Sequence, residues 1–230
     1  YSTSTNKSTQ AENLYGDSFE QKIFTSRVQL GKRFGNYHWA YLKSGFDYIE
    51  TPFYIEGVNA SDNNIDKTLI VGASYVYDTR DLTLYAANGI YAFFNYELKG
   101  LGVDGINYQV ADLEFREYRK IVERFTAKWR MSIRHTAGET VPYYDYSYLG
   151  YSERIRGYFH DGESEGNERF IGSVEINYPI IEETRINLYW LPLLPNSLLS
   201  YRVAIIAGLF GDTGTTRNTG EPLAIKNFNS

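Results

Sequence analysis

The feature that most constrains the fold of this chain is a two-residue alternation between apolar and polar side chains. The clearest stretch runs from Phe125 to Arg134. Its odd-numbered positions carry five apolar side chains, and its even-numbered positions carry three cations together with Thr and Ser. On a β-strand these two sets lie on opposite faces, whereas on a helix they would be scattered around the circumference. The stretch therefore predicts a strand with one apolar and one polar face.

The same alternation recurs along the chain and predicts eight strands. They cover residues 21–33, 37–49, 67–77, 90–101, 107–121, 125–137, 168–179 and 201–211. Most are longer than the mean strand of about 5–6 residues in soluble proteins. Their lengths approach the ~9–11 residues that a tilted strand needs to cross a bilayer. We therefore expect an all-β fold, an antiparallel transmembrane β-barrel.

The connections between these strands alternate in length. Short ones lie at 34–36 and 122–124, and long polar ones lie at 50–66 and 138–167. Short periplasmic turns and long extracellular loops are typical of outer-membrane barrels. Two connections fit less well, because 102–106 is short on the loop side and 180–200 is long and apolar on the turn side. An extended strand end with an interfacial aromatic anchor is one interpretation of the second.

The composition agrees with a barrel and excludes several other classes. Aromatic residues make up 17% of the chain, which suits the aromatic girdles of a membrane barrel. The mean hydropathy of −0.42 is low for a membrane protein, and no run approaches the ~20 apolar residues that a spanning helix needs. In a barrel every second residue can be polar. The net charge of −5 does not favour nucleic acid as a partner. The absence of Cys excludes disulfides and thiolate metal sites.

Three motifs occur in a fixed order along the predicted elements. The first is Asp78-Thr79-Arg80-Asp81 with Gly89 before the next strand, the second is Arg154-Ile155-Arg156-Gly157-Tyr158 in the loop 138–167, and the third is Ser173-Val174-Glu175 followed by Phe210-Gly211-Asp212-Thr213-Gly214. Each is common by chance when taken alone. Together they resemble the turn, sixth-loop and strand signatures of the BamA/TamA superfamily of outer-membrane assembly and translocation proteins, the bacterial surface antigen barrel domain. The resemblance spans about residues 67–214, and residues 1–66 are consistent by pattern only.

This resemblance implies a barrel larger than the chain itself. The family has a sixteen-stranded barrel preceded by periplasmic POTRA domains. We expect residues 1–230 to form part of one such barrel domain in the outer membrane and to supply its middle eight strands, without the POTRA domains and the terminal strands. Eight strands alone would leave two open edges in lipid, so additional chain or another polypeptide would complete the barrel. The polar start at Tyr1 has no initiating Met or signal peptide, and we interpret the chain as an internal fragment or a processed piece.

The resemblance also implies a contact between the long loop and the strands. In the family this loop folds into the lumen, which predicts that Arg156 pairs with Asp212 and has Glu175 nearby. A guanidinium offers a planar fork of donors that two carboxylates can accept. Gly157 would allow a tight turn, and Tyr158 could pack its ring and offer its hydroxyl. The alternatives are a solvated Arg156, a turn role for Asp212, and a lumen carboxylate of no particular role at Glu175.

For function, the resemblance implies a protein that assists the folding and insertion of other proteins into the outer membrane. Its partners would be unfolded outer-membrane clients, outer-membrane lipids, and periplasmic or lipoprotein partners, with no cofactor. The alternatives are a two-partner-secretion-type translocation pore, a passive porin-like channel, and a soluble β-sandwich lectin, which would lack a continuous apolar band. We do not expect an enzyme, because His38, His135 and His160 lack ligand spacing and no G-x-S-x-G motif occurs.

Overall fold

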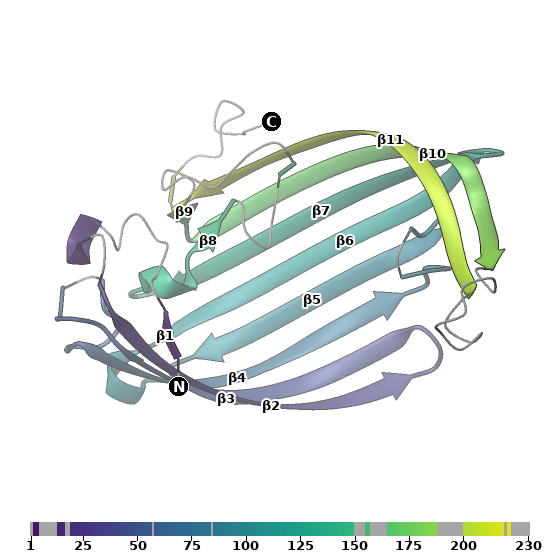
Figure 1. Ribbon diagram of the computed structural model, residues 1–230. Coiled ribbons are helices and arrows are strands. Elements are labelled where there is room, and N and C mark those ends of the chain that lie inside the picture. The colour runs from purple at the N-terminus through teal and green to yellow at the C-terminus, as the bar shows by residue number, and fades with distance from the viewer. Residues whose placement is uncertain are drawn as a thin grey trace, which may run out of the picture.

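The computed structural model describes residues 2–4, 13–16, 19–56, 58–83, 85–149, 155–156, 165–187, 200–218 and 220–221. These residues form a nine-stranded sheet and a separate two-stranded sheet. The order in the large sheet is β1-β2-β3-β4-β5-β6-β7-β10-β11, and every neighbouring pair is antiparallel (Figure 1). Within the described part of the chain, β1 and β11 are the two edges of this sheet. None of the helices there is long and apolar enough to cross a membrane.

The strand bounds agree closely with the alternation in the sequence. The large sheet consists of β1 (Ser2–Ser4), β2 (Gln21–Phe34), β3 (His38–Glu50), β4 (Ile65–Asp78), β5 (Gly89–Lys99), β6 (Tyr108–Val122), β7 (Phe125–Gly138), β10 (Glu168–Asn187) and β11 (Ser200–Arg217). The small sheet pairs β8 (Ser147–Tyr148) with β9 (Glu165–Gly166), and two 3-10 helices, η1 (Val103–Gly105) and η2 (Tyr143–Asp145), lie in loops. The predicted all-β antiparallel fold is therefore confirmed.

The predicted strand ends need two corrections. The first is that β5 ends at Lys99 rather than at residue 101, because Gly100 and Leu101 have positive φ angles of 88° and 53° and turn the chain out of the sheet. The second is that both strands of the last hairpin are longer than predicted: β11 continues to Arg217 rather than ending at residue 211, and residues 180–187 and 200 are strand rather than connection. Register shifts between Pro179 and Ile181 and between Ile181 and Thr184 interrupt the alternation there, which hides the strand in the sequence. Residues 188–199 lie outside the described residues.

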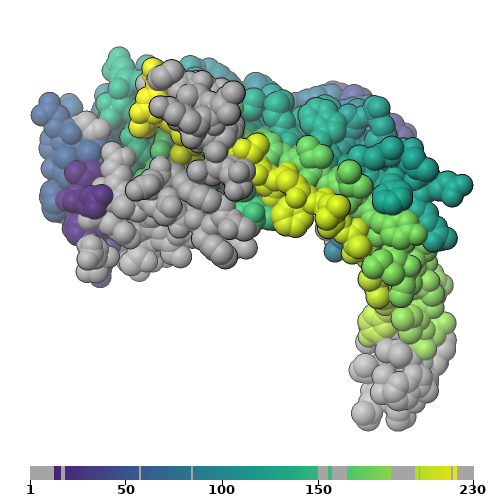
Figure 2. All heavy atoms as spheres, turned by 90° about the horizontal axis from the view of Figure 1, so that it is seen from above, coloured from purple at the N-terminus to yellow at the C-terminus, as the bar shows by residue number. Residues whose placement is uncertain are grey.

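The lengthened hairpin of β10 and β11 projects beyond the rest of the sheet. The pairing of β10 with β7 ends at Asn177, opposite Thr126, whereas its pairing with β11 continues to Asn187. Figure 2 shows this end of the hairpin bending away from the body of the sheet. At about 3.3 Å per residue, the ten residues beyond Asn177 could reach roughly 30 Å if fully extended.

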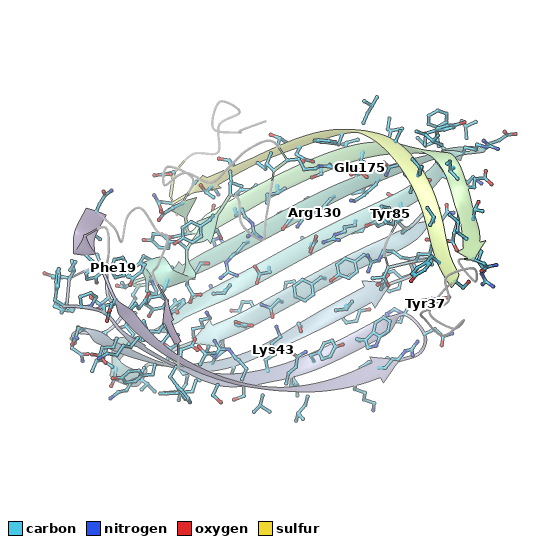
Figure 3. The ribbon with its side chains drawn as sticks, viewed as in Figure 1. Phe19, Tyr37, Lys43, Tyr85, Arg130 and Glu175 are labelled. Atoms are coloured by element: carbon cyan, nitrogen blue, oxygen red, sulfur yellow. The ribbon has the colours of Figure 1, made fainter. Side chains whose placement is uncertain are left out.

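The pairing register separates a polar face from an apolar face. Residues paired across antiparallel strands share a face, so the polar face collects Lys43, Glu97, Asn95, Asp112, Glu114, Arg130, Arg134 and Glu175. The apolar face carries exposed Leu30, Leu42, Val71, Phe94, Leu113, Trp129 and Val174. Such a band of exposed apolar side chains is what a membrane barrel presents to lipid. Lys43, Arg130 and Glu175 reach the polar face from three different strands (Figure 3).

Charges on the polar face are paired between neighbouring strands. Arg130 Nε lies 2.7 Å from Glu114 Oε1. Arg134 Nη1 lies 3.0 Å from Asp112 Oδ1. Such cross-strand pairs fix the register and satisfy the polar groups that the curved sheet encloses.

The long connections pack together at one end of the sheet and form the main buried core. One cluster contains Ile106, Tyr108, Val110 and Val141, and a second contains Phe19 and Tyr143. Beside them Lys99 Nζ donates to the Asp145 carboxylate at 2.6 and 2.8 Å, and the Tyr108 hydroxyl donates to the same group at 2.5 Å. We call this set of three residues the loop-end anchor. It ties the loop after β7 to the ends of β5 and β6.

Candidate loop contact on the polar face

Arg156 lies in the long loop and reaches the carboxylates of two strands. Its Nε donates to Asp212 Oδ2 at 2.7 Å and its Nη2 donates to Asp212 Oδ1 at 2.8 Å. Its Nη1 donates to Glu175 Oε2 at 2.6 Å. The backbone N–H of Arg156 donates to Asp212 Oδ2 at 2.9 Å. We call these three residues the face anchor.

The strand register explains why the two acids converge on one guanidinium. Glu175 of β10 pairs with Phe210 of β11, and Asp212 pairs with Ser173, so both acids point to the same face two positions apart. The planar fork of the arginine then binds Asp212 through two nitrogens and Glu175 through the third. The guanidinium carbon also lies 3.8 Å from the centre of the Phe210 ring, which adds a cation–π contact.

Burial is uneven within the face anchor. The Asp212 side chain is 3% exposed and the Glu175 side chain is 18% exposed, whereas Arg156 retains 39%. Lys128 Nζ lies 3.8 Å from Glu175 and offers that carboxylate a second cation. The hydrogen bonds to Asp212 and Glu175 raise the pKa of Arg156 above its ordinary value, so its charge is permanent. The enclosed Asp212 therefore depends on Arg156 more than Glu175 does.

An apolar contact next to Arg156 supports the same position of the loop. Ile155, Leu149 and Ile171 form a buried cluster. A Cβ added at Gly214 would lie 2.8 Å from Ile155 Cδ1 and 3.2 Å from Leu149 Cδ2. Gly214 therefore leaves the space on β11 that the loop fills. Apolar packing and charge pairing act at adjacent positions to hold this part of the loop against the sheet.

The turn motif forms a separate local structure between β4 and β5. Asp78 lies in the same cross-strand row of the sheet as Asp212, a row that passes through Tyr91, Arg116, Arg130 and Ser173. Arg80 Nη2 donates to Asp78 Oδ2 at 2.7 Å, and its guanidinium carbon lies 4.7 Å from the centre of the Tyr91 ring. Asp81 Oδ1 accepts from the N–H of Ala87 at 3.0 Å. These bonds close the turn between β4 and β5 and do not reach the face anchor.

Gly89 has a conformational reason to be glycine. Its φ is 117°, and an added Cβ would lie 2.5 Å from the backbone oxygen of Thr79. Both the angle and the close approach exclude a side chain at this position. Gly157 and Tyr158 of the loop motif lie outside the described residues.

Sequence reasoning did not assign the apolar part of this contact. It treated Phe210 and Gly214 only as signature residues and did not single out Ile171. A signal was present, because Ile171 has the same parity as Ser173 and Glu175 and is an apolar residue on a polar face. Such an exception to the alternation indicates that another segment packs there. Among the described residues no group of three or more His, Cys, Asp or Glu is placed to hold a metal ion.

Comparisons with known proteins agree with this fold. Residues 1–190 match the family model described as the Omp85 superfamily domain, a match that ends before the Phe210–Gly214 motif. The chain is similar in structure to BamA from Haemophilus ducreyi lacking POTRA domains 1–3, with a TM-score of 0.64 and 16% identity over 87% of this chain and 43% of that one. It thus spans less than half the length of that protein. Comparison with curated proteins gave no match. The chain therefore belongs to the Omp85 superfamily, the BamA/TamA group of β-barrel proteins of the bacterial outer membrane.

Proposed function

We propose that this chain is part of a protein that assists the folding and insertion of other proteins into the outer membrane. Membership of the Omp85 superfamily supports a role in outer-membrane protein insertion or translocation in general. The similar structure of BamA from Haemophilus ducreyi supports the barrel fold on which this role depends, and the choice of insertion within that range is part of the proposal. The clients would be unfolded outer-membrane proteins, and periplasmic or lipoprotein partners would deliver them.

The observation that carries this proposal is the face anchor. Arg156 joins the long loop to β10 and β11 through four hydrogen bonds to Asp212 and Glu175. An open polar interior is sufficient for a passive channel, and a loop held at one place on the wall gives the interior a defined shape in addition. A protein that handles clients needs an interior of defined shape, because a preorganised surface binds with a smaller loss of conformational entropy.

We infer that the role involves no covalent chemistry. The face anchor consists of two carboxylates hydrogen-bonded to one guanidinium, an arrangement suited to positioning rather than to proton transfer. Folding of the client and its contact with lipid would supply the free energy, and no cofactor would be required.

The test is a reconstitution assay with the Arg156→Ala variant. The protein is placed in liposomes, and the folding of an added outer-membrane β-barrel client is followed by its heat-modifiable gel mobility. We expect R156A to fold but to insert the client at least several-fold more slowly, because the loop loses its contact with the wall. The matched control is Arg119→Ala, which removes an arginine that is 76% exposed and pairs locally with Glu117.

The other outcomes contradict the proposal in different ways. If folded R156A inserts the client at the wild-type rate, the face anchor has no role in insertion. If the wild-type liposomes insert no client but move a secreted polypeptide across the bilayer, the translocation pore replaces the insertase. If they only admit small solutes, the protein is a passive channel.

A further inference from the structure

An apolar groove of about 790 Å³ lies on the apolar face, across β2, β3, β4 and β5. These strands lie in the lower part of the sheet in Figure 1. Its walls are formed by Leu30, Phe34, Leu42, Tyr75, Phe94 and Tyr96. The volume is within the roughly 300–1,000 Å³ range of small-molecule sites. The residues of the face anchor and of the loop-end anchor are not among those that line it.

Two alanines create the hollow. Ala73 lies between Leu42 and Tyr96 in one cross-strand row, because it pairs with both. Ala40 pairs with Lys32 on one side and with Tyr75 on the other. Large side chains therefore surround two small ones, and the apolar face has a depression above the two alanines.

One end of the groove carries a positive charge. Lys32 is the charged residue among those that line the groove in the described part of the chain. Its Nζ lies 5.3 Å from the centre of the Phe34 ring, near the short turn that joins β2 to β3. Beside it, His38 Nδ1 lies 2.6 Å from the Tyr75 hydroxyl. Aromatic rings and a lysine at a strand end are typical of the membrane interface.

We propose that this groove binds one anionic phospholipid of the membrane. An acyl chain lies in the hollow over Ala40 and Ala73, and the headgroup phosphate meets the Lys32 ammonium. Among the described residues β3 to β5 are paired on both sides, whereas β2 pairs with β1 only at Gln21, Lys22 and Ile23 and has an unpaired edge from Phe24 to Phe34. An added strand would bind the backbone of that edge. The groove itself is formed by side chains of the apolar face, which an acyl chain fits. The apolar walls and the cation at the interface match the two ends of one lipid molecule.

The proposal is independent of the insertion role and is tested by lipid retention. The protein is extracted in mild detergent, exchanged into micelles with phosphatidylglycerol or phosphatidylethanolamine, and analysed by native mass spectrometry. We expect one phosphatidylglycerol to be retained in preference to phosphatidylethanolamine. Lys32→Gln should lower that preference about five-fold, since one lysine near an anionic surface contributes ~1 kcal/mol.

Filling the hollow tests the acyl-chain half of the site. Ala73→Phe, or Ala40→Leu if the first variant does not fold, should abolish retention of either lipid. The matched controls are Ala127→Phe on β7 and Lys67→Gln at the loop end of β4, both on the apolar face and outside the groove. Folding of every variant is checked by heat-modifiable mobility.

The outcomes are decisive in both directions. Loss of the preference in K32Q and of retention in A73F, with both controls unchanged, supports the site. Equal retention of the two lipids by the wild type, or equal losses in the variants and their controls, overturns it and leaves only annular lipid.

Discussion

The long loop after β7 is attached to the sheet at two places that differ in burial. In the loop-end anchor, Lys99 is 8% exposed and Asp145 is 14% exposed. In the face anchor, Asp212 is 3% exposed but Arg156 is 39% exposed. Both join the same connection to the same sheet through a short ion pair. The first excludes water from both partners, and the second leaves its cation open to water.

This difference separates stability from positioning. Burial by itself raises the pKa of Asp145, but the interactions with Lys99, Tyr108 and Arg134 lower it by more than burial raises it. The pKa of Asp145 therefore lies below its ordinary value, and the carboxyl is charged near neutrality. Removing either charge of that pair leaves the other buried without a counter-charge. At the face anchor Arg156 is partly exposed, so water can form some of the hydrogen bonds that a substitution there removes. We therefore expect the loop-end anchor to control unfolding and the face anchor to control the place of the loop.

The largest expected effect is at the loop-end anchor. Asp145→Asn keeps the shape of the side chain but leaves Lys99 without its counter-charge, which should lower the free energy of unfolding by about 3–5 kcal/mol. The measurement is denaturant unfolding in lipid vesicles, followed by gel mobility. The control is Glu139→Gln, an exposed acid in the same loop. Equal stability of the two variants would show that Lys99 finds another partner.

A smaller and unequal effect is expected for the two acids of the face anchor. Asp212→Asn weakens three hydrogen bonds from Arg156, whereas Glu175→Gln weakens one and leaves Lys128 nearby. We expect a loss of about 1–3 kcal/mol for D212N and less than about 1 kcal/mol for E175Q. The comparison is of unfolding midpoints under one condition. A larger loss for E175Q would contradict the role of burial.

The conservative change Arg156→Lys sharpens the same contrast. It keeps the charge but replaces a fork of donors by a single ammonium, which cannot bind both acids in the same plane. We expect protease cleavage of the loop to become faster while the unfolding midpoint changes little. Limited proteolysis of intact, folded protein measures the first quantity. Cleavage at the wild-type rate would mean that charge alone positions the loop.

The smallest effect on stability is expected at Tyr143, in the buried cluster that the long connections form at one end of the sheet. The Tyr143 hydroxyl is buried and has no hydrogen-bond partner among the described residues. Tyr143→Phe should therefore change stability by less than about 0.5 kcal/mol, or increase it slightly. Tyr144→Phe is the control, because it loses a 2.8 Å bond to Asp66. Equal losses in the two variants would show that the Tyr143 hydroxyl has a partner such as water.

Alternation in the sequence was sufficient for most of the sheet but not for its irregular parts. Phe125 to Arg134 predicted β7 because each side chain has one of two environments. The end of β10 escaped detection because bulges around Ile181 shift the period and both faces there carry isoleucine. The positive φ at Leu101 has no local sequence signal apart from the flanking glycines. Local patterns report strands, whereas bulges depend on the neighbouring strand.

The charged part of the candidate site was accessible from motifs, and its packing was not. The pairing of Arg156 with Asp212 and Glu175 was expected from the family signatures, and the structure places these atoms within hydrogen-bonding distance. The loop-end anchor had no such signal, because Lys99 and Asp145 are 46 residues apart in unrelated motifs. Only the folded arrangement of the loop after β7 against the ends of β5 and β6 brings them together.

The topology described above also bears on the order in which the chain assembles. From β1 to β7 every strand pairs with the strand next to it in sequence, so the sheet can grow hairpin by hairpin as the chain arrives. The step from β7 to β10 is different, because the segment between Gly138 and Glu168 must be spanned first. Closing a longer loop adds a modest entropic barrier. Growth would therefore pause at the segment that carries Arg156, and docking of that residue would accompany the addition of the last two strands.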